Sequence, residues 1–155
     1  MDPKENDLSD LIAGHLNPQG SHGQRDAFLK RFIDSLKLPE TFERTLASIQ
    51  REHGTTHLTH VTRFVDVVLE FPDYAIAIEN KPWAGAQASQ LEGYRAHLDS
   101  RYGGRFCLIY LTADGRPPGS MSEEIVKDEM KAGRLALLSF QRHIPVLARR
   151  LHQDL

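Results

Sequence analysis

Residues 61–81 read VTRFVDVVLEFPDYAIAIENK, and this stretch decides the fold. Its first half is rich in valine and aromatic residues, Pro72-Asp73 is a turn signal, and the run that follows is apolar as far as Glu79. β-Branched and aromatic residues favour strands, and a proline–aspartate pair between two such runs is typical of a turn. The stretch therefore predicts a β-hairpin, and its nearly continuous apolar runs predict strands that are covered on both faces.

Further elements are predicted around this hairpin from the spacing of apolar residues. Helices are expected at 7–16, 25–36, 84–99, 122–132 and 142–152, and strands at 105–112 and 135–140. In the first helix Leu8, Leu11, Ile12 and Leu16 are expected on one apolar stripe, and Ser122 is expected as the N-cap of the helix at 122–132. Residues 42–53 have a spacing that allows a helix, but we interpret their second half as a strand. A strand–helix–strand unit crosses over right-handed, so its strands should be parallel. The prediction is an α/β fold in which a mixed central β-sheet is flanked by helices.

Composition is that of an ordinary globular protein. The chain has 155 residues, 40% hydrophobic and 26% charged, which suits a single domain over residues 1–155. A net charge of −2 argues against binding nucleic acid by bulk charge alone, although acidic metal ligands also lower the net charge. Cys107 is the only cysteine, and no segment reads as a secretory signal or a membrane span. We therefore expect a cytoplasmic protein that does not contact membranes.

Three ionisable residues interrupt the apolar runs of the hairpin. Asp66 lies within the first run, and Glu79 and Lys81 end the second. A buried charge is strongly disfavoured unless it is paired or bound to a metal. Because side chains alternate across a strand, Glu79 and Lys81 should point to one face and Asn80 to the other.

The length of the turn sets which residues of the hairpin face each other. With a two-residue turn, Phe71 faces Tyr74, and Asp66 then lies opposite Glu79 with Cβ atoms about 4.5–5.5 Å apart. Two carboxylates this close repel unless a cation lies between them, and hard divalent cations prefer oxygen ligands. The pattern thus predicts a divalent-metal site, with the backbone carbonyl of Asn80 as a further ligand. The alternative is that Glu79 and Lys81 form an edge salt bridge and that Asp66 caps a turn.

These residues, taken in order, resemble the signature of the PD-(D/E)XK nuclease superfamily. The proline that gives the superfamily its name is replaced in this chain by Val65, and the residue at that position varies within the superfamily. One bacterial family within it shows a similar pattern, which this chain matches with Arg63 and Asp66, then Glu79-Asn80-Lys81, then Gln90-Leu91 and Tyr94. The resemblance implies a restriction-endonuclease-like core.

The resemblance also implies a role for each residue of the pattern. Asp66 and Glu79 would be metal ligands, and Lys81 would be the catalytic lysine. Gln90 would orient Lys81, water or phosphate, or else it is a solvated helix residue. Arg63 would contact phosphate. Tyr94 would contact the substrate, although its spacing from Leu91 and Leu98 is also that of an ordinary core stripe.

The function expected from these observations is Mg²⁺- or Mn²⁺-dependent hydrolysis of DNA by an endonuclease. Its role would lie in restriction, repair or defence against phage. Two alternatives are an RNA-directed nuclease and a catalytically silent module that binds nucleic acid or protein. A homodimer is expected if both strands of a duplex are cut, and a partner protein if the chain lacks a basic surface of its own.

Other residues with potential chemistry have simpler interpretations. His53, His57 and His60 have a spacing that would bring them together on a helix and hold zinc, but the intervening Gly and Thr residues favour a loop or strand. Cys107 lies in an apolar run and is interpreted as a small core residue. Trp83 would stack on a base or anchor the start of the following helix.

Overall fold

The computed structural model describes residues 3–21, 23–39, 42–51, 66–81, 89–119, 121–139 and 142–143, with the backbone alone for residues 3–8 and 89–90. The helices and strands follow one another in the order α1 (Pro3–Leu16), α2 (Ala27–Asp34), β1 (Ser48–Arg51), β2 (Val67–Phe71), β3 (Tyr74–Lys81), α3 (Ser89–Tyr102), β4 (Phe106–Thr112), α4 (Glu123–Lys131) and β5 (Leu135–Ser139). No helix in this described part is long and apolar enough to cross a membrane.

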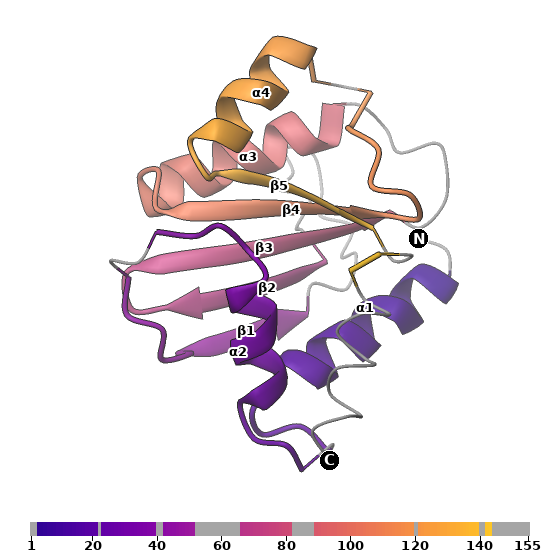
Figure 1. The fold of residues 1–155 in the computed structure, drawn as a ribbon, viewed down its shortest axis with the longest axis vertical. Coiled ribbons are helices and arrows are strands. Elements are labelled where there is room, and N and C mark those ends of the chain that lie inside the picture. The colour runs from indigo at the N-terminus through magenta and orange to yellow at the C-terminus, as the bar shows by residue number, and fades with distance from the viewer. Residues whose placement is uncertain are drawn as a thin grey trace, which may run out of the picture.

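The strands form one mixed sheet in the order β1-β2-β3-β4-β5 (Figure 1). β1, β2 and β3 are joined by antiparallel pairing, whereas β3, β4 and β5 are joined by parallel pairing. The hairpin has the predicted register, because Phe71 faces Tyr74 across Pro72-Asp73 and Val67 faces Ile78. The prediction of a mixed sheet, in which the strands before and after a connecting helix are parallel, is confirmed.

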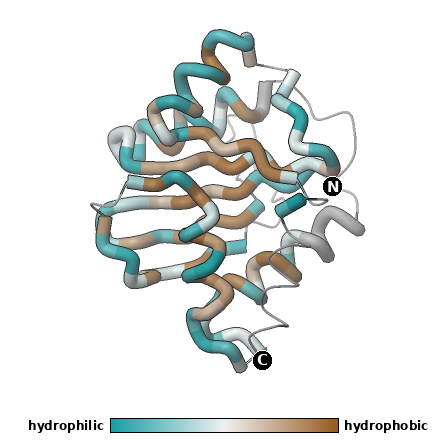
Figure 2. Tube along the Cα trace, viewed as in Figure 1, coloured by the Kyte–Doolittle hydropathy of each residue, from teal (hydrophilic) through white to brown (hydrophobic). Residues whose placement is uncertain are grey.

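Helices cover both faces of the sheet, and each face has its own hydrophobic cluster. Alternation along β3 sends Ile76 and Ile78 toward α1 and α2, and Ala75 and Ala77 toward α3 and α4. Figure 2 shows hydrophobic residues gathered along the central strands, with hydrophilic residues on α4 and in the turns. Burying one large aliphatic side chain contributes about 1.5–3 kcal/mol. The two clusters therefore fix which face of the sheet each strand residue occupies.

Several helix boundaries differ from the sequence prediction. α1 begins at Pro3, four residues before the predicted start, since proline is favoured in the first turn of a helix. Within α1, Leu11 was expected on the buried stripe but is 55% exposed. The buried stripe follows Ser9, Ile12, Ala13 and Leu16, which leaves Leu11 on the outer side.

The ends of α2 and α3 also differ. α2 is shorter than predicted, and α3 continues past residue 99 to Tyr102. Gly103 and Gly104 then adopt positive φ angles of 58° and 80°, which end the helix without the strain that other residues would suffer.

Several predicted features lie outside the described residues. They are residues 61–65 of the first hairpin strand, the start of the helix predicted at 84–99, residues 144–152 of the last helix, the histidines His53, His57 and His60, the site residue Arg63, and Trp83.

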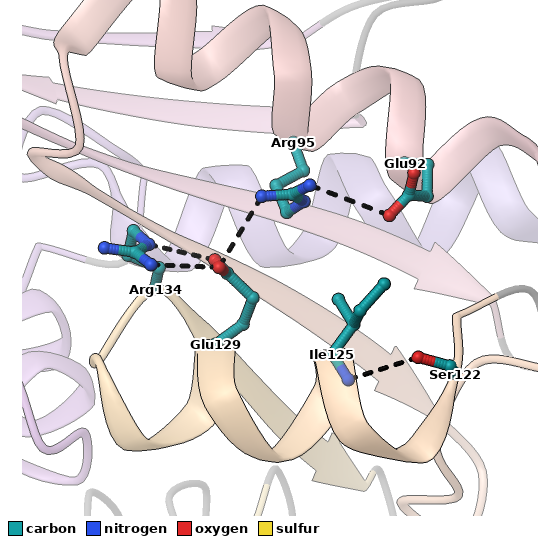
Figure 3. A network of polar contacts seen from close by, with 6 residues as sticks. All are labelled: Glu92, Arg95, Ser122, Ile125, Glu129 and Arg134. Carbon is teal, nitrogen blue, oxygen red and sulfur yellow. Dashed lines mark hydrogen bonds and ion pairs between the residues drawn. The ribbon is translucent and has the colours of Figure 1, made fainter.

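α4 is capped and tied to its neighbours by polar contacts (Figure 3). As predicted, Ser122 is the N-cap, and its hydroxyl accepts a hydrogen bond of 3.2 Å from the backbone N–H of Ile125. The buried Glu129 accepts two hydrogen bonds of 2.9 Å from Arg134, and Arg95 on α3 lies 3.5 Å from the same carboxylate. Glu129 thus joins α4 to α3 and to the residue that precedes β5.

Candidate active site

Asp66 lies immediately before β2, at the open end of the hairpin. It is 2% exposed. Continuing the hairpin register one pair beyond Val67 and Ile78 places Asp66 opposite Glu79. Asp66 Oδ2 accepts a hydrogen bond of 2.8 Å from the backbone N–H of Asn80. This bond holds the carboxylate against the strand that carries Glu79.

Glu79 and Lys81 lie at the end of β3, on the face covered by α3 and α4. Glu79 is 3% exposed, whereas part of the Lys81 side chain reaches the surface. Lys81 Nζ lies 3.5 Å from Glu79 Oε1. The ammonium offsets part of the desolvation cost of burying the carboxylate. By alternation, Asp66 shares this face with Glu79, because Val68 packs in the cluster under α3.

Asn80 points to the opposite face, as the alternation predicts. Its side-chain Nδ2 donates a hydrogen bond of 3.1 Å to Ser9 Oγ on α1, and both residues are fully buried. Its backbone N–H is the donor to Asp66. Asn80 therefore links the carboxylate on one face of the sheet to the helix on the other.

Arg51, the last residue of β1, approaches Asp66 from the other side. Its Nη1 donates a hydrogen bond of 2.6 Å to the backbone carbonyl of Asp66. Its Nε donates a bond of 2.8 Å to Asp10 Oδ1 on α1. Asp66 is thus held through its backbone from β1 and through its side chain from β3.

β4 adds two polar residues beside the carboxylates. In the parallel register Glu79 is paired with Tyr110, and Lys81 with Thr112. Burial raises the pKa of the Tyr110 phenol; Arg116 counteracts this increase and Glu79 adds to it. The phenol therefore stays protonated at neutral pH and retains a proton to donate. Thr112 Oγ1 accepts a hydrogen bond of 2.8 Å from the backbone N–H of Gly115, which organises the turn after β4.

A comparison with protein families gives a match that covers nearly the whole chain. The family model described as the PD-(D/E)XK nuclease superfamily matches residues 1–148. The chain belongs to this superfamily. Its five described strands and four described helices agree with the restriction-endonuclease-like α/β fold expected from the sequence. No curated protein and no solved structure matches the chain.

The structure brings together some of the residues that the superfamily resemblance singled out. Asp66, Glu79 and Lys81 meet at one end of the sheet. Tyr94 is buried in the cluster with Leu91 and Leu98, in the arrangement of a core stripe, and its contact with substrate stays a prediction. Arg63 and the side chain of Gln90 lie outside the described residues.

Four residues around this site were not predicted from the sequence: Ser9, Asp10, Arg51 and Tyr110. Ser9 carries the one signal that local reasoning could have used, because a polar residue on the apolar stripe of a helix indicates a buried partner. Nothing in the sequence around Arg51 or Tyr110 indicates which strand lies beside it.

The donor set fits the divalent metal that superfamily members generally use. Within the described part of the chain, no three His, Cys, Asp or Glu side chains are grouped to hold an ion. Two buried carboxylates on one face are nevertheless a suitable set for Mg²⁺, which is commonly held by one or two carboxylates while water and substrate phosphate complete its coordination. Asp66 and Glu79 supply those carboxylates.

Proposed function

We propose that the protein is a Mg²⁺- or Mn²⁺-dependent endonuclease that hydrolyses phosphodiester bonds of DNA. The observation that carries this proposal is the placement of two buried carboxylates at the open end of the hairpin, Asp66 just before β2 and Glu79 on β3, with the Lys81 ammonium beside Glu79. Membership of a nuclease superfamily supports the reaction class. Restriction, repair or defence against phage would be the setting for such an activity.

Each residue of the proposed site has a distinct task. Asp66 and Glu79 would hold the cation, together with the backbone carbonyl of Asn80. When bound, the ion neutralises charge on the phosphate and lowers the pKa of a coordinated water. Lys81 is partly exposed, so its ammonium can hold the attacking water or stabilise the charge that develops on the phosphate. Water attacks the phosphorus and loses a proton to the solvent, the bond to the leaving oxygen breaks, and that oxygen takes up a proton from the solvent.

Cutting both strands of a duplex with one site per chain would require two copies. The proposal therefore includes a homodimer for double-strand cleavage, and a single chain for nicking. A chain with a net charge of −2 presents little bulk attraction for DNA, so a partner protein would supply a basic surface if the chain alone binds weakly.

The test is cleavage of supercoiled plasmid, single-stranded DNA and RNA in Mg²⁺ or Mn²⁺, with Lys81→Ala compared with wild type. Lys131→Ala is the matched control, because Lys131 is an exposed lysine in the last turn of α4. We expect wild type and the control to cut DNA, and Lys81→Ala to cut on the order of 100-fold more slowly, equivalent to about 2.7 kcal/mol of transition-state stabilisation. Thermal unfolding shows whether each variant is folded.

Other outcomes reassign the function. Full activity in Lys81→Ala removes the lysine from the mechanism. Cutting of RNA alone changes the substrate class. Absence of both cutting and specific Mn²⁺ binding by the wild type favours a silent binding module.

A further inference from the structure

We propose that Arg51 is a positioning residue for Asp66 and that, held by Asp10 on α1, it sets the affinity of the site for its metal. This inference rests on the proposed function, since it concerns the same carboxylate. Arg51 itself would touch neither metal nor substrate. It would act by fixing the place of Asp66.

Asp66 adjoins the last described pair of the β1–β2 ladder, which is formed by Arg51 and Val67. At this point the backbone carbonyl of Asp66 accepts the 2.6 Å bond from Arg51 Nη1. This bond fixes the backbone of the residue that carries the proposed metal ligand.

Arginine suits this task because its guanidinium is a rigid fork that donates in two fixed directions at once. The Arg51 side chain is 12% exposed, and its Nε is held by Asp10 Oδ1 at 2.8 Å while Nη1 holds Asp66. A lysine at this position would supply the charge without the two fixed directions.

α1 supports the site at a second point. Ser9, adjacent to Asp10, accepts the 3.1 Å bond from the Asn80 side chain, and the backbone N–H of Asn80 donates the 2.8 Å bond to Asp66 Oδ2. Two consecutive residues of α1 thus reach Asp66 by two routes, one through β1 and one through β3. Partners of metal ligands arranged in this way typically change metal affinity by about 10- to 100-fold when they are removed.

The positive charge of Arg51 should weaken metal binding, whereas its positioning of Asp66 should strengthen it. A guanidinium beside a cation site repels the cation, so removing it would strengthen binding if charge alone mattered. Asp10 neutralises that charge through its ion pair with Arg51. We therefore expect the loss of positioning to outweigh the loss of repulsion, and metal binding to weaken.

The test measures Mn²⁺ dissociation constants by electron paramagnetic resonance or calorimetry for wild type, Arg51→Gln and Arg51→Lys. Arg105→Gln is the matched control. The Arg105 guanidinium also donates two hydrogen bonds, but at the turn end of the sheet. Its Nε donates to the backbone carbonyl of Asp73 at 2.7 Å, and its Nη2 donates to the Asp73 carboxylate at 2.9 Å. We expect Arg51→Gln to raise the dissociation constant about 10- to 100-fold and Arg51→Lys to restore it incompletely. Arg105→Gln should leave it unchanged.

Cleavage supplies an independent readout. With Arg51→Gln, saturating Mn²⁺ should recover most of the wild-type rate, because the fault lies in metal occupancy. An unchanged dissociation constant in Arg51→Gln, or an equal rise in Arg105→Gln, would overturn the positioning role.

Asp10→Asn keeps the test decisive if circular dichroism shows that Arg51→Gln is unfolded. Asp10 is exposed on α1, so its substitution threatens folding less, and we expect a severalfold rise in the dissociation constant. No rise overturns the inference. If the wild-type protein binds Mn²⁺ but does not cut nucleic acid, the proposed nuclease function is wrong, and the comparison of dissociation constants still tests the role of Arg51. If the wild-type protein binds no Mn²⁺, both the proposed function and the role of Arg51 are wrong.

Discussion

Asp66 and Glu79 are carboxylates that lie buried at the open end of the hairpin. Burying an ionised side chain is costly, and replacing even a buried ion pair with apolar residues of similar volume is often neutral or stabilising. The contacts around these two residues, the Asn80 amide for Asp66 and the Lys81 ammonium for Glu79, make their burial tolerable. Retaining two such groups within one sheet face favours a chemical role over a structural one.

Asp66→Asn separates these two roles. The Asn side chain still offers an oxygen to the backbone N–H of Asn80, so we expect the free energy of unfolding to stay within about 1 kcal/mol of wild type. The lost negative charge should abolish Mn²⁺ binding and slow cleavage on the order of 100-fold. Thermal unfolding, metal titration and cleavage rates measure the three quantities. Wild-type cleavage by Asp66→Asn would remove this residue from the site.

Prediction succeeded where the contact is local in sequence. Asp66, Glu79 and Lys81 belong to one hairpin, so strand alternation and the length of its turn were enough to place them together. Arg51 and Asp10 are separated by 41 positions, and Asn80 and Ser9 by 71. Those contacts depend on where α1 packs, which no local pattern in the sequence specifies.

At the scale of elements, the contacts of Glu129 hold α3, α4 and the start of β5 together. α3 packs over the face that carries the proposed site, so the Glu129 contacts fix the helix that covers it. The hydrogen bonds from Arg134 lower the pKa of Glu129 below its ordinary value of 4.5, and this effect outweighs the opposite effect of burial.

The pH dependence of stability should report this contact. A lowered folded-state pKa means that the carboxylate stabilises the fold above about pH 4.5, and that this stabilisation is lost as the pH falls through the folded-state pKa. Glu129→Gln should lower the free energy of unfolding by about 1–3 kcal/mol at neutral pH and reduce its decline in acid. Urea unfolding at about pH 7 and about pH 3.5 measures both. Parallel pH curves for the two proteins would contradict the assignment.

Element type was predicted better than element boundaries. Residues 42–53 allowed helix or strand, and pairing with β2 makes Ser48–Arg51 a strand. Leu11 was misplaced because a run of apolar residues fits more than one helical stripe, and packing of α1 on the sheet selects among them. Both outcomes depend on tertiary contacts that outweigh local preference.

At the scale of the whole molecule, the two ends of the hairpin are built differently. The site end carries buried charges, whereas the turn end carries an aromatic cluster. Phe42 stacks on Tyr74 with ring centroids 4.4 Å apart and meets Phe71 edge-on at 5.3 Å. Phe42 is buried and belongs to the connection between α2 and β1, so the cluster joins that connection to the sheet.

Phe42→Ala should therefore weaken the fold without altering the site. Removing a buried phenylalanine typically costs about 3–5 kcal/mol, a large fraction of the roughly 5–15 kcal/mol that stabilises a domain. We expect urea unfolding to show a decrease of that size in the free energy of unfolding. The Mn²⁺ dissociation constant should be unchanged under conditions where the variant stays folded. A weakened metal affinity in the folded variant would show that the two ends of the sheet are coupled.

The two-residue turn has a consequence for how the gene tolerates change. The aliphatic residues between positions 67 and 78 can be replaced by other aliphatic residues. The number of residues in this segment cannot change, because it sets which residue lies opposite Glu79. One inserted codon in β2 turns Asp66 to the face opposite Glu79, although neither codon has been altered. Two inserted codons restore the face but move Asp66 opposite Lys81. Small in-frame insertions should therefore inactivate the gene as thoroughly as substitutions at the carboxylates themselves.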